Sequence, residues 1–370
     1  MSVVVDPLEV FRAKGIPHRR VEDWKYSDLR SVLDAEAVEH AEPLEWTISK
    51  PAGVEEFDLD DDDYPDEVYR GLYSLSNGGA MDAAARAFDQ NIAVLYVSAD
   101  AQVVEPLKLD LMSSGHGLMV LFVNRGASLT LMETHHVAGA SLRNLSLSIF
   151  LEEGAQLTHI REAKFAGELV TVETISVVQE KGSTYRARFL NGGAKLSRTE
   201  VNITLAGEGA EADLSGVSVL GDKAHADITT RIDHAVPNTT SRQLFKKAAG
   251  GKSRAVYQGK IIVREGAIGS DSRQTAKALL LSDRAEADLK PELEILADDV
   301  KCAHGAAVGD LDADSLFYLR SRGIPEAEAR GLLIHAFLQE VVDGIEDEGL
   351  RGAAVEFIDS GLAWAMESAS

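Results

Sequence analysis

The feature that most constrains the fold is a run of short alternating segments over residues 92–308. Segments such as AVLYV, AQLTHI and GKIIV alternate between apolar and polar side chains, which is typical of strands. Most of them follow a glycine and a small residue; these turns are Gly126-Ala127, Gly154-Ala155, Gly182-Ser183, Gly193-Ala194, Gly209-Ala210 and Gly266-Ala267. We expect each turn to be a corner where glycine adopts positive φ or lets a neighbouring coil approach closely.

No amphipathic helix interrupts this region, which disfavours a doubly wound α/β sheet. A solenoid whose coils stack strand on strand fits the pattern better. We therefore predict a mainly β protein, with a parallel β-helix over residues 91–309. A large β-sandwich is the alternative.

Residues 1–90 combine short helical signals with polar loops, and we expect them to form a capping region. The spacing of Leu8 and Phe11 suits one short helix, and residues 82–88 suit another. Between them, EEFDLDDDDYPDE at residues 55–67 crowds carboxylates that repel one another. Because this segment lacks the glycine of an EF-hand turn, we predict a solvated loop rather than a calcium site.

The chain becomes helical again in a C-terminal region that we place at residues 310–370. Asp312 or Asp314 can cap a first helix, which stops near Gly323. Two further helices are expected, over residues 326–345 and about residues 350–366.

The net charge of −23 opposes phosphate backbones and anionic lipids, so nucleic acid and membrane surfaces are not expected partners. The N-terminus has no apolar run of signal length, and no stretch approaches the roughly 20 apolar residues of a membrane span. These features predict a soluble, cytoplasmic protein. The single cysteine, Cys302, excludes an internal disulfide.

Signals for nucleotide binding and catalysis are weak. Gly251-Lys252-Ser253 resembles the end of a phosphate-binding loop, but Lys246 stands where the first glycine is required. A strand pattern also follows where a helix should begin, so we interpret this segment as a polar turn. No G-x-S-x-G elbow or local Ser-His-Asp signature occurs, and we predict that the protein is not an enzyme.

The histidines of the strand region include His135, His136, His159, His225 and His234. Measured from the glycine of its own corner, His135 lies nine residues on and His159 five, so the two should not stack in adjacent coils. We predict no ready-made histidine cluster, and expect single histidines that are hydrogen-bonded or face solvent.

Cys302 and His304 lie two residues apart on what should be the last strand, so both side chains point to the same face. A thiol and an imidazole side by side can ligate soft or borderline metals. The alternative is a buried cysteine beside a histidine whose hydrogen bonds are satisfied. The spacing allows both interpretations.

Two segments resemble the SufB/SufD family of iron–sulfur cluster assembly proteins. Residues 268–324 resemble the C-terminal signature of the family almost throughout; their sequence is IGSDSRQTAKALLLSDRAEADLKPELEILADDVKCAHGAAVGDLDADSLFYLRSRGI. Residues 19–29, RRVEDWKYSDL, resemble a W-K-Y-[ST]-x-L element that is typical of its SufD members. The resemblance therefore brackets the whole chain.

This resemblance implies a right-handed parallel β-helix with helical flanks, acting as a non-catalytic scaffold subunit. It implies pairing with SufB at a shared β-helix end, a cysteine-rich cluster site on SufB, and one SufC ATPase bound to each subunit. One cysteine cannot supply the four thiolates that usually hold a cluster. His304, in the C-x-H-G motif, is then expected to be a transient iron or cluster ligand shared with SufB, with Cys302 as the weaker candidate. A flavin on the complex and a homodimer of the isolated chain are left open.

The helix over residues 326–345 has more apolar surface than one core-facing stripe requires. Given the resemblance, we expect it to bind the SufC ATPase through outward positions among Leu333, Phe337 and Val341. Packing against the helix over residues 350–366 is the alternative. Two other functions stay open as alternatives: a β-helix enzyme, either a polysaccharide lyase or an acyltransferase, and a SufB-like scaffold that holds a cluster alone.

Overall fold

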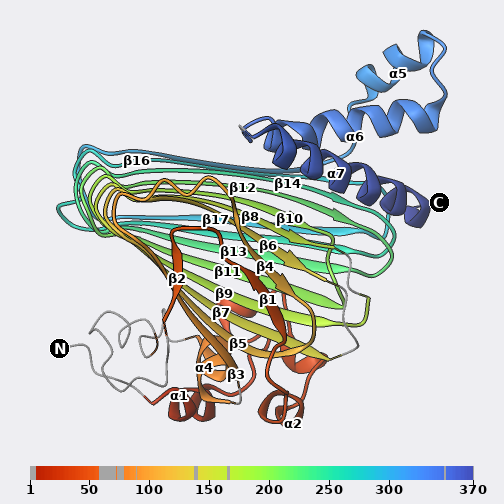
Figure 1. Ribbon diagram of the computed structural model, residues 1–370. Coiled ribbons are helices and arrows are strands. Elements are labelled where there is room, and N and C mark those ends of the chain that lie inside the picture. Colours follow the sequence, from red (N-terminus) through yellow and green to blue (C-terminus); the bar gives the residue numbers. More distant parts are fainter. Residues whose placement is uncertain are drawn as a thin grey trace.

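The computed structural model shows two nine-stranded β-sheets that face each other, with helices on both outer faces (Figure 1). It describes residues 6–57, 72, 79–88, 90–136, 141–164, 167–345 and 347–369. From β3 onward, successive strands alternate between the two sheets, and neighbours within each sheet are parallel. This is the predicted parallel β-helix, and the β-sandwich alternative is wrong.

Each coil contributes one strand to each sheet. Sheet A contains β2 (Val54–Glu56), β3 (Gln90–Val97), β5 (Gly115–Val123), β7 (Leu142–Leu151), β9 (Val170–Gln179), β11 (Leu196–Leu205), β13 (His225–His234), β15 (Arg254–Val263) and β17 (Glu286–Ile295). Sheet B contains β1 (Trp46–Ser49), β4 (Leu107–Leu111), β6 (Ser128–His135), β8 (Gln156–Ala163), β10 (Thr184–Asn191), β12 (Glu211–Leu220), β14 (Thr240–Ala249), β16 (Asp271–Leu280) and β18 (Lys301–Gly309).

Alternation along each strand separates an interior face from an outer face. In β6, Leu129 and Leu131 are buried in the core between the sheets, whereas Thr130 and Met132 are only half-buried. Leu157 of β8 lies in register with Leu129, so apolar side chains stack from coil to coil. Full burial of each such side chain contributes about 1.5–3 kcal/mol, and this stacking is the main stabilising interaction of the solenoid.

The predicted corners are confirmed. All six glycines of the Gly-small turns have positive φ, from +63° at Gly182 to +83° at Gly266. The corners also stack closely, since a Cβ on Gly154 would meet the Cα of Gly126 at 3.9 Å. Gly251-Lys252-Ser253 forms the turn before β15, with φ of +63° at the glycine, as the polar-turn interpretation predicts.

The N-terminal region contains strands as well as the predicted helices. Among the described residues, its helices include α1 (Pro7–Lys14), η1 (Glu22–Trp24), η2 (Leu29–Ser31), α2 (Ala35–Glu39) and α4 (Ala80–Ala87). β1 and β2, of four and three residues, were not predicted because strands so short show no measurable alternation. They pair antiparallel with β4 and β3 at the start of the solenoid. Most of the acidic segment 55–67 lies outside the described residues.

Residues 19–29, which we call the strap, pack on the outer face of sheet A. The ring of Trp24 lies over the Arg198 guanidinium, 4.1 Å from ring centroid to Cζ. Ser27 Oγ donates to Asp227 Oδ2 at 2.5 Å, and Arg198 Nη1 donates to the same oxygen at 2.5 Å. The W-K-Y-S-x-L element therefore joins the N-terminal region to β11 and β13.

The three predicted C-terminal helices are α5 (Ala313–Ser321), α6 (Glu326–Val342) and α7 (Glu348–Ala369). Asp312 caps α5 through Oδ2, which accepts from Ser315 N at 2.7 Å. α6 and α7 pack on sheet B against β12 and β14, whereas α5 projects away from the solenoid (Figure 1). Among the described residues, no helix is long and apolar enough to span a membrane.

Candidate functional site

The predicted metal-binding pair lies on β18, the final strand of sheet B. Ser272 and Gln274 of β16 lie in register beside Cys302 and His304, and both are buried. Cys302 and His304 therefore continue the interior face of the solenoid, on one side of the strand as expected. Cys302 is half-buried and His304 exposed, because no described strand covers the outer edge of β18.

A column of polar side chains leads through the interior to His304. Tyr257 Oη donates to Gln243 Oε1 at 3.0 Å and accepts from Gln274 Nε2 at 3.0 Å. Gln243, Gln274 and His304 occupy the same register position on β14, β16 and β18. His304 is therefore the last member of a polar column that reaches the open end of the solenoid.

Cys302 ends a second column, formed with Ser241 and Ser272. The hydroxyls of the two serines are 2.6 Å apart, and His234 Nε2 lies 2.9 Å from Ser241 Oγ. Burial raises the pKa of the Cys302 thiol, against a smaller lowering by the Ser272 backbone. The thiol is therefore protonated at neutral pH, and a metal must displace its proton.

The expected partner-binding residues on α6 differ in exposure. Val341 is only 3% exposed and belongs to the core between α6, α7 and sheet B. It does not point outward, which corrects that expectation. Leu333 is half-buried, and so is Phe337, whose ring centroid lies 4.5 Å from Lys246 Nζ. Packing against α7, the alternative considered above, therefore accounts for part of the apolar surface of α6.

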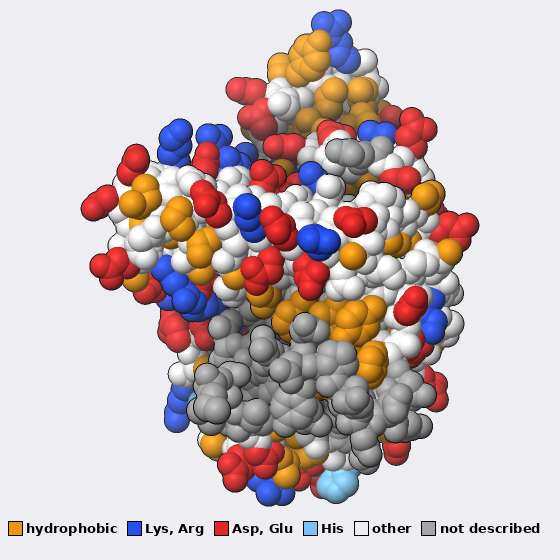
Figure 2. Space-filling view, turned by 60° about the vertical axis from the view of Figure 1, so that its left-hand side comes forward, with side chains coloured by type: hydrophobic (Ala, Val, Ile, Leu, Met, Phe, Trp, Pro, Cys, Tyr) orange, Lys and Arg blue, Asp and Glu red, His pale blue; other side chains and the backbone are white. Residues whose placement is uncertain are grey.

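Larger apolar side chains are exposed on α5 and at the start of α6. Phe317, Tyr318 and Leu332 are 73%, 56% and 49% exposed. Hydrophobic side chains gather on the lobe at the top of Figure 2, where α5 projects from the solenoid. This surface is more accessible than the face that holds Leu333 and Phe337.

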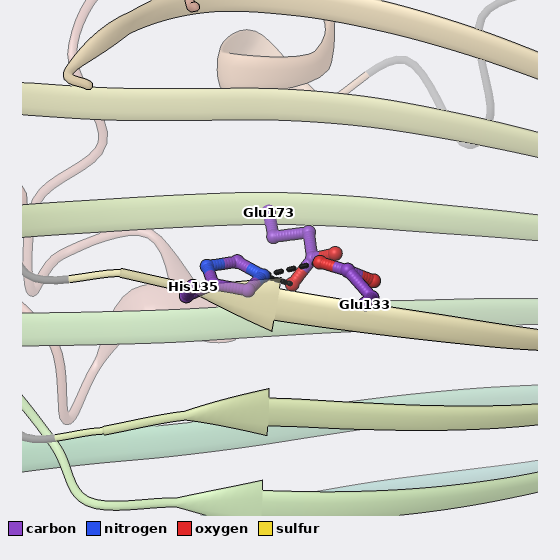
Figure 3. A group of neighbouring side chains, drawn as sticks. All are labelled: Glu133, His135 and Glu173. Carbon is purple, nitrogen blue, oxygen red and sulfur yellow. Dashed lines mark hydrogen bonds and ion pairs between the residues drawn. The ribbon is translucent and has the colours of Figure 1, made fainter. Parts of the chain in front are cut away.

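A further site, which the sequence analysis did not predict, lies inside the solenoid (Figure 3). Glu133 Oε2 accepts from His159 Nε2 at 2.9 Å, and its Oε1 contacts His135 Nε2. Glu173 Oε2 lies 3.8 Å from His135 Nε2 and accepts from Arg161 Nε. We call these five buried residues of β6, β8 and β9 the interior charged cluster.

The environment of the cluster shifts its protonation equilibria. Burial raises the pKa of Glu173 to about 7, against the charge of Arg161. Burial also acts to raise the pKa of Glu133, but the His159 hydrogen bond and the Arg161 charge outweigh it and leave that pKa below its ordinary value. Burial and Arg161 hold the pKa of His135 well below 6.5. At neutral pH, Glu133 is therefore ionised, His135 is neutral and Glu173 is partly protonated.

The alternation of β6 contained a signal for this cluster. Glu133 and His135 occupy interior positions in the same series as Leu131, which places a carboxylate and an imidazole on the buried face. His135 lies in register with Ala163 rather than with His159, so the two histidines do not stack in adjacent coils, as predicted. They are joined through Glu133 instead, and a comparison of histidines alone misses that connection.

The other three histidines named in the sequence analysis are also as predicted. His136 is exposed near Asp110, whereas His225 and His234 are hydrogen-bonded to hydroxyl groups of Ser27 and Ser241, respectively. None of these three residues belongs to the interior charged cluster.

Residues 111–337 match a domain described as SUF system FeS cluster assembly, SufBD core domain. The chain belongs to the SufB/SufD family. A SufBD family protein of Synechocystis is 34% identical over 244 residues, which cover 63% of this chain and 54% of that protein. SufD of Escherichia coli is 29% identical over 383 aligned positions, which cover 93% of this chain and 89% of that protein. A SufBD family protein of Mycobacterium tuberculosis is 30% identical over 361 positions, covering 92% and 86%.

Membership in this family favours the assembly interpretation over the lyase and acyltransferase alternatives. The matched range 111–337 includes Cys302 and His304, and it also includes the interior charged cluster. Both sites therefore lie in the part of the chain that defines the family.

Proposed function

We propose that this chain is a non-catalytic scaffold subunit of an iron–sulfur cluster assembly complex, and that it acts through the open end of its β-helix. The observation that carries this proposal is the uncovered last coil. β17 and β18 are ten and nine residues long, and no described strand pairs with their outer edges. At the same end, Ile295, Leu296 and Val308 are 42%, 59% and 46% exposed. Long edge strands with exposed apolar side chains are favourable sites for strand addition by a partner.

The proposed partner at this end is SufB, a β-helix of the same family. Its strands would extend both sheets, and the interior columns that end at Cys302 and His304 would then face the partner's interior. His304 would act there as a transient iron or cluster ligand, with Cys302 as the weaker one. Because this chain has a single cysteine, SufB would supply the remaining ligands.

Co-expression with SufB and SufC, followed by co-purification and cluster maturation, tests this proposal. We expect His304→Ala to leave the complex intact, since the side chain is exposed, and to impair maturation. His136→Ala is the matched control, because it also removes a surface histidine but lies far from β18. Normal maturation by the His304 variant would contradict the ligand role, and loss of the complex would make the residue structural.

We further propose that a SufC ATPase binds the exposed face of α5 and the start of α6. The support is the apolar surface of Phe317, Tyr318 and Leu332, which no described segment covers. Phe317→Glu is expected to abolish SufC binding and leave the unfolding temperature nearly unchanged, because the side chain is 73% exposed. Val341→Glu is the contrasting control and is expected to unfold the helical region. If Phe317→Glu and Leu333→Glu both bind SufC with unchanged affinity, the docking surface lies elsewhere.

A further inference from the structure

The interior charged cluster contains polar atoms that the fold leaves without partners. Within the described part of the chain, His135 Nδ1, Glu173 Oε1 and Arg161 Nη1 are buried and make no hydrogen bond. The side chains of His135 and Glu173 are 4% and 2% exposed. A buried polar atom without a partner costs about 1–3 kcal/mol. Of these three atoms, Glu173 Oε1 is an acceptor that a cation from outside the chain can bind, whereas Arg161 Nη1 is a donor and cannot be a metal ligand.

We propose that Glu133, His135 and Glu173 bind one divalent transition-metal ion of the Mn²⁺, Fe²⁺ and Zn²⁺ class. One ligand atom from each residue lies within 4.8 Å of the others, and the three side chains converge on one point (Figure 3). Metal–ligand bonds of about 2.0–2.2 Å place ligand atoms about 3–3.5 Å apart, so small side-chain rotations complete the site. His159, hydrogen-bonded to the second oxygen of Glu133, orients that carboxylate from behind.

The donor set selects the class of ion. Carboxylate oxygens favour Mg²⁺, Ca²⁺ and Mn²⁺, whereas an imidazole nitrogen favours Zn²⁺ and Fe²⁺, and the combination suits ions that accept both. The cluster contains no thiolate, because the only cysteine, Cys302, lies on β18, six strands from β6 in sheet B. The site therefore holds a single ion rather than an iron–sulfur cluster. It is separate from the open end, and the inference does not rest on the proposed function.

Arg161 limits the affinity of this site. Its Nε donates to Glu173 Oε2, while Glu173 Oε1 has no partner among the described residues. A cation can bind Oε1 while Arg161 keeps Oε2, but two positive charges then share one carboxylate. Repulsion between them weakens binding. Removing the guanidinium should therefore strengthen metal binding, which is the opposite of what a simple structural ion pair predicts.

The cluster is buried but lies close to the surface. His135 is the last residue of β6, and the side chain of the following residue, His136, is 46% exposed. Arg143 Nη2 donates to the carbonyl oxygen of His136 at 2.8 Å and closes this end of the strand.

Equilibrium dialysis of the full-length chain against Co²⁺, followed by visible absorption, tests the proposal. We expect one Co²⁺ per chain, bound at least about 100-fold more weakly by His135→Gln and by Glu173→Gln. Arg161→Met should bind Co²⁺ more tightly than the unmodified chain. His136→Ala and His304→Ala are matched controls, and both should bind with unchanged affinity.

Equal affinities in the chain and both ligand variants would overturn the proposal, as would no binding at millimolar Co²⁺. Because the ligand variants remove buried charged or polar groups and can fail to fold, X-ray absorption on the Zn²⁺ complex of the unmodified chain provides a second measurement. A coordination shell of nitrogen and oxygen alone is expected. Sulfur in that shell would place the ion at Cys302 and overturn the assignment.

Discussion

Replacing Asp227 with asparagine should release the strap from sheet A. Asp227 and Arg198 are both 0% exposed, and their ion pair is the centre of the contact with Ser27 and Trp24. Breaking a buried pair by removing one charge costs about 3–5 kcal/mol. Glu200 still lies 2.7 Å from Arg198 Nη2 and neutralises it in part, so we expect the lower end, about 3 kcal/mol.

Hydrogen–deuterium exchange of the strap amides measures how often the strap opens. The amides of Trp24 and Ser27 are hydrogen-bonded within the strap, to the carbonyls of Val21 and Trp24. A loss of about 3 kcal/mol corresponds to about 100-fold more of the open state, since each 1.4 kcal/mol is tenfold. These amides should therefore exchange about 100-fold faster in Asp227→Asn, while the amides of β6 remain unchanged.

Lys290→Ala is the matched control for the strap. It removes a salt bridge of 2.7 Å to Glu22, another strap residue, but the Glu22 side chain is 69% exposed. Exposed pairs contribute at most about 1 kcal/mol, so exchange should accelerate by less than about fivefold. If Asp227→Asn is no faster than Lys290→Ala, the buried ion pair does not hold the strap and the reasoning is wrong.

Three further predictions concern buried groups. The native state holds a proton on Glu173 up to about pH 7, so the contribution of this residue to the free energy of unfolding falls as pH rises from 4.5 to 7. The difference in free energy of urea unfolding between the unmodified chain and Glu173→Gln should fall by about 1.4 kcal/mol per pH unit over this range. A difference that does not change with pH would contradict the prediction. Burial lowers the pKa of His234 to about 4, so the unfolded state alone gains a proton as pH falls from 6.5 to 4; His234→Gln should flatten the acid dependence of the urea midpoint. Gly250→Ala would collide with the Ala365 carbonyl on α7, and a loss of about 1–3 kcal/mol should appear first in the fluorescence of Trp364 during thermal unfolding.

The β-helix could be predicted because each coil repeats two local signals. Alternation marks the strands, and a glycine such as Gly154 marks the corner, so neither signal depends on distant residues. The caps of α5 are equally local, at Asp312 and Gly323. β1 and β2 could not be predicted, because their extended conformation comes from pairing with β4 and β3 rather than from their own three or four residues.

The candidate sites also differ in whether local sequence signals could predict them. The common face of Cys302 and His304 follows from their spacing on one strand. The interior charged cluster depends on how β6 and β9, in opposite sheets, meet across the core, and the position of Glu173 relative to Glu133 is a tertiary property. The helical period likewise predicts which apolar residues share a face of α6 with Val341. It does not predict which face of α6 packs against sheet B.

The two ends of the solenoid differ in a way that limits the size of an assembly. The N-terminal end finishes in short antiparallel strands, β1 and β2, which offer little for another chain to extend. The C-terminal end finishes in β17 and β18, which are long and parallel to their neighbours. A solenoid with long, unpaired strands at both ends could add further chains head to tail and form a filament. A solenoid with such strands at one end only can bind one further chain there. In the proposed end-to-end binding, the short N-terminal strands would therefore prevent a second addition and restrict association to pairs.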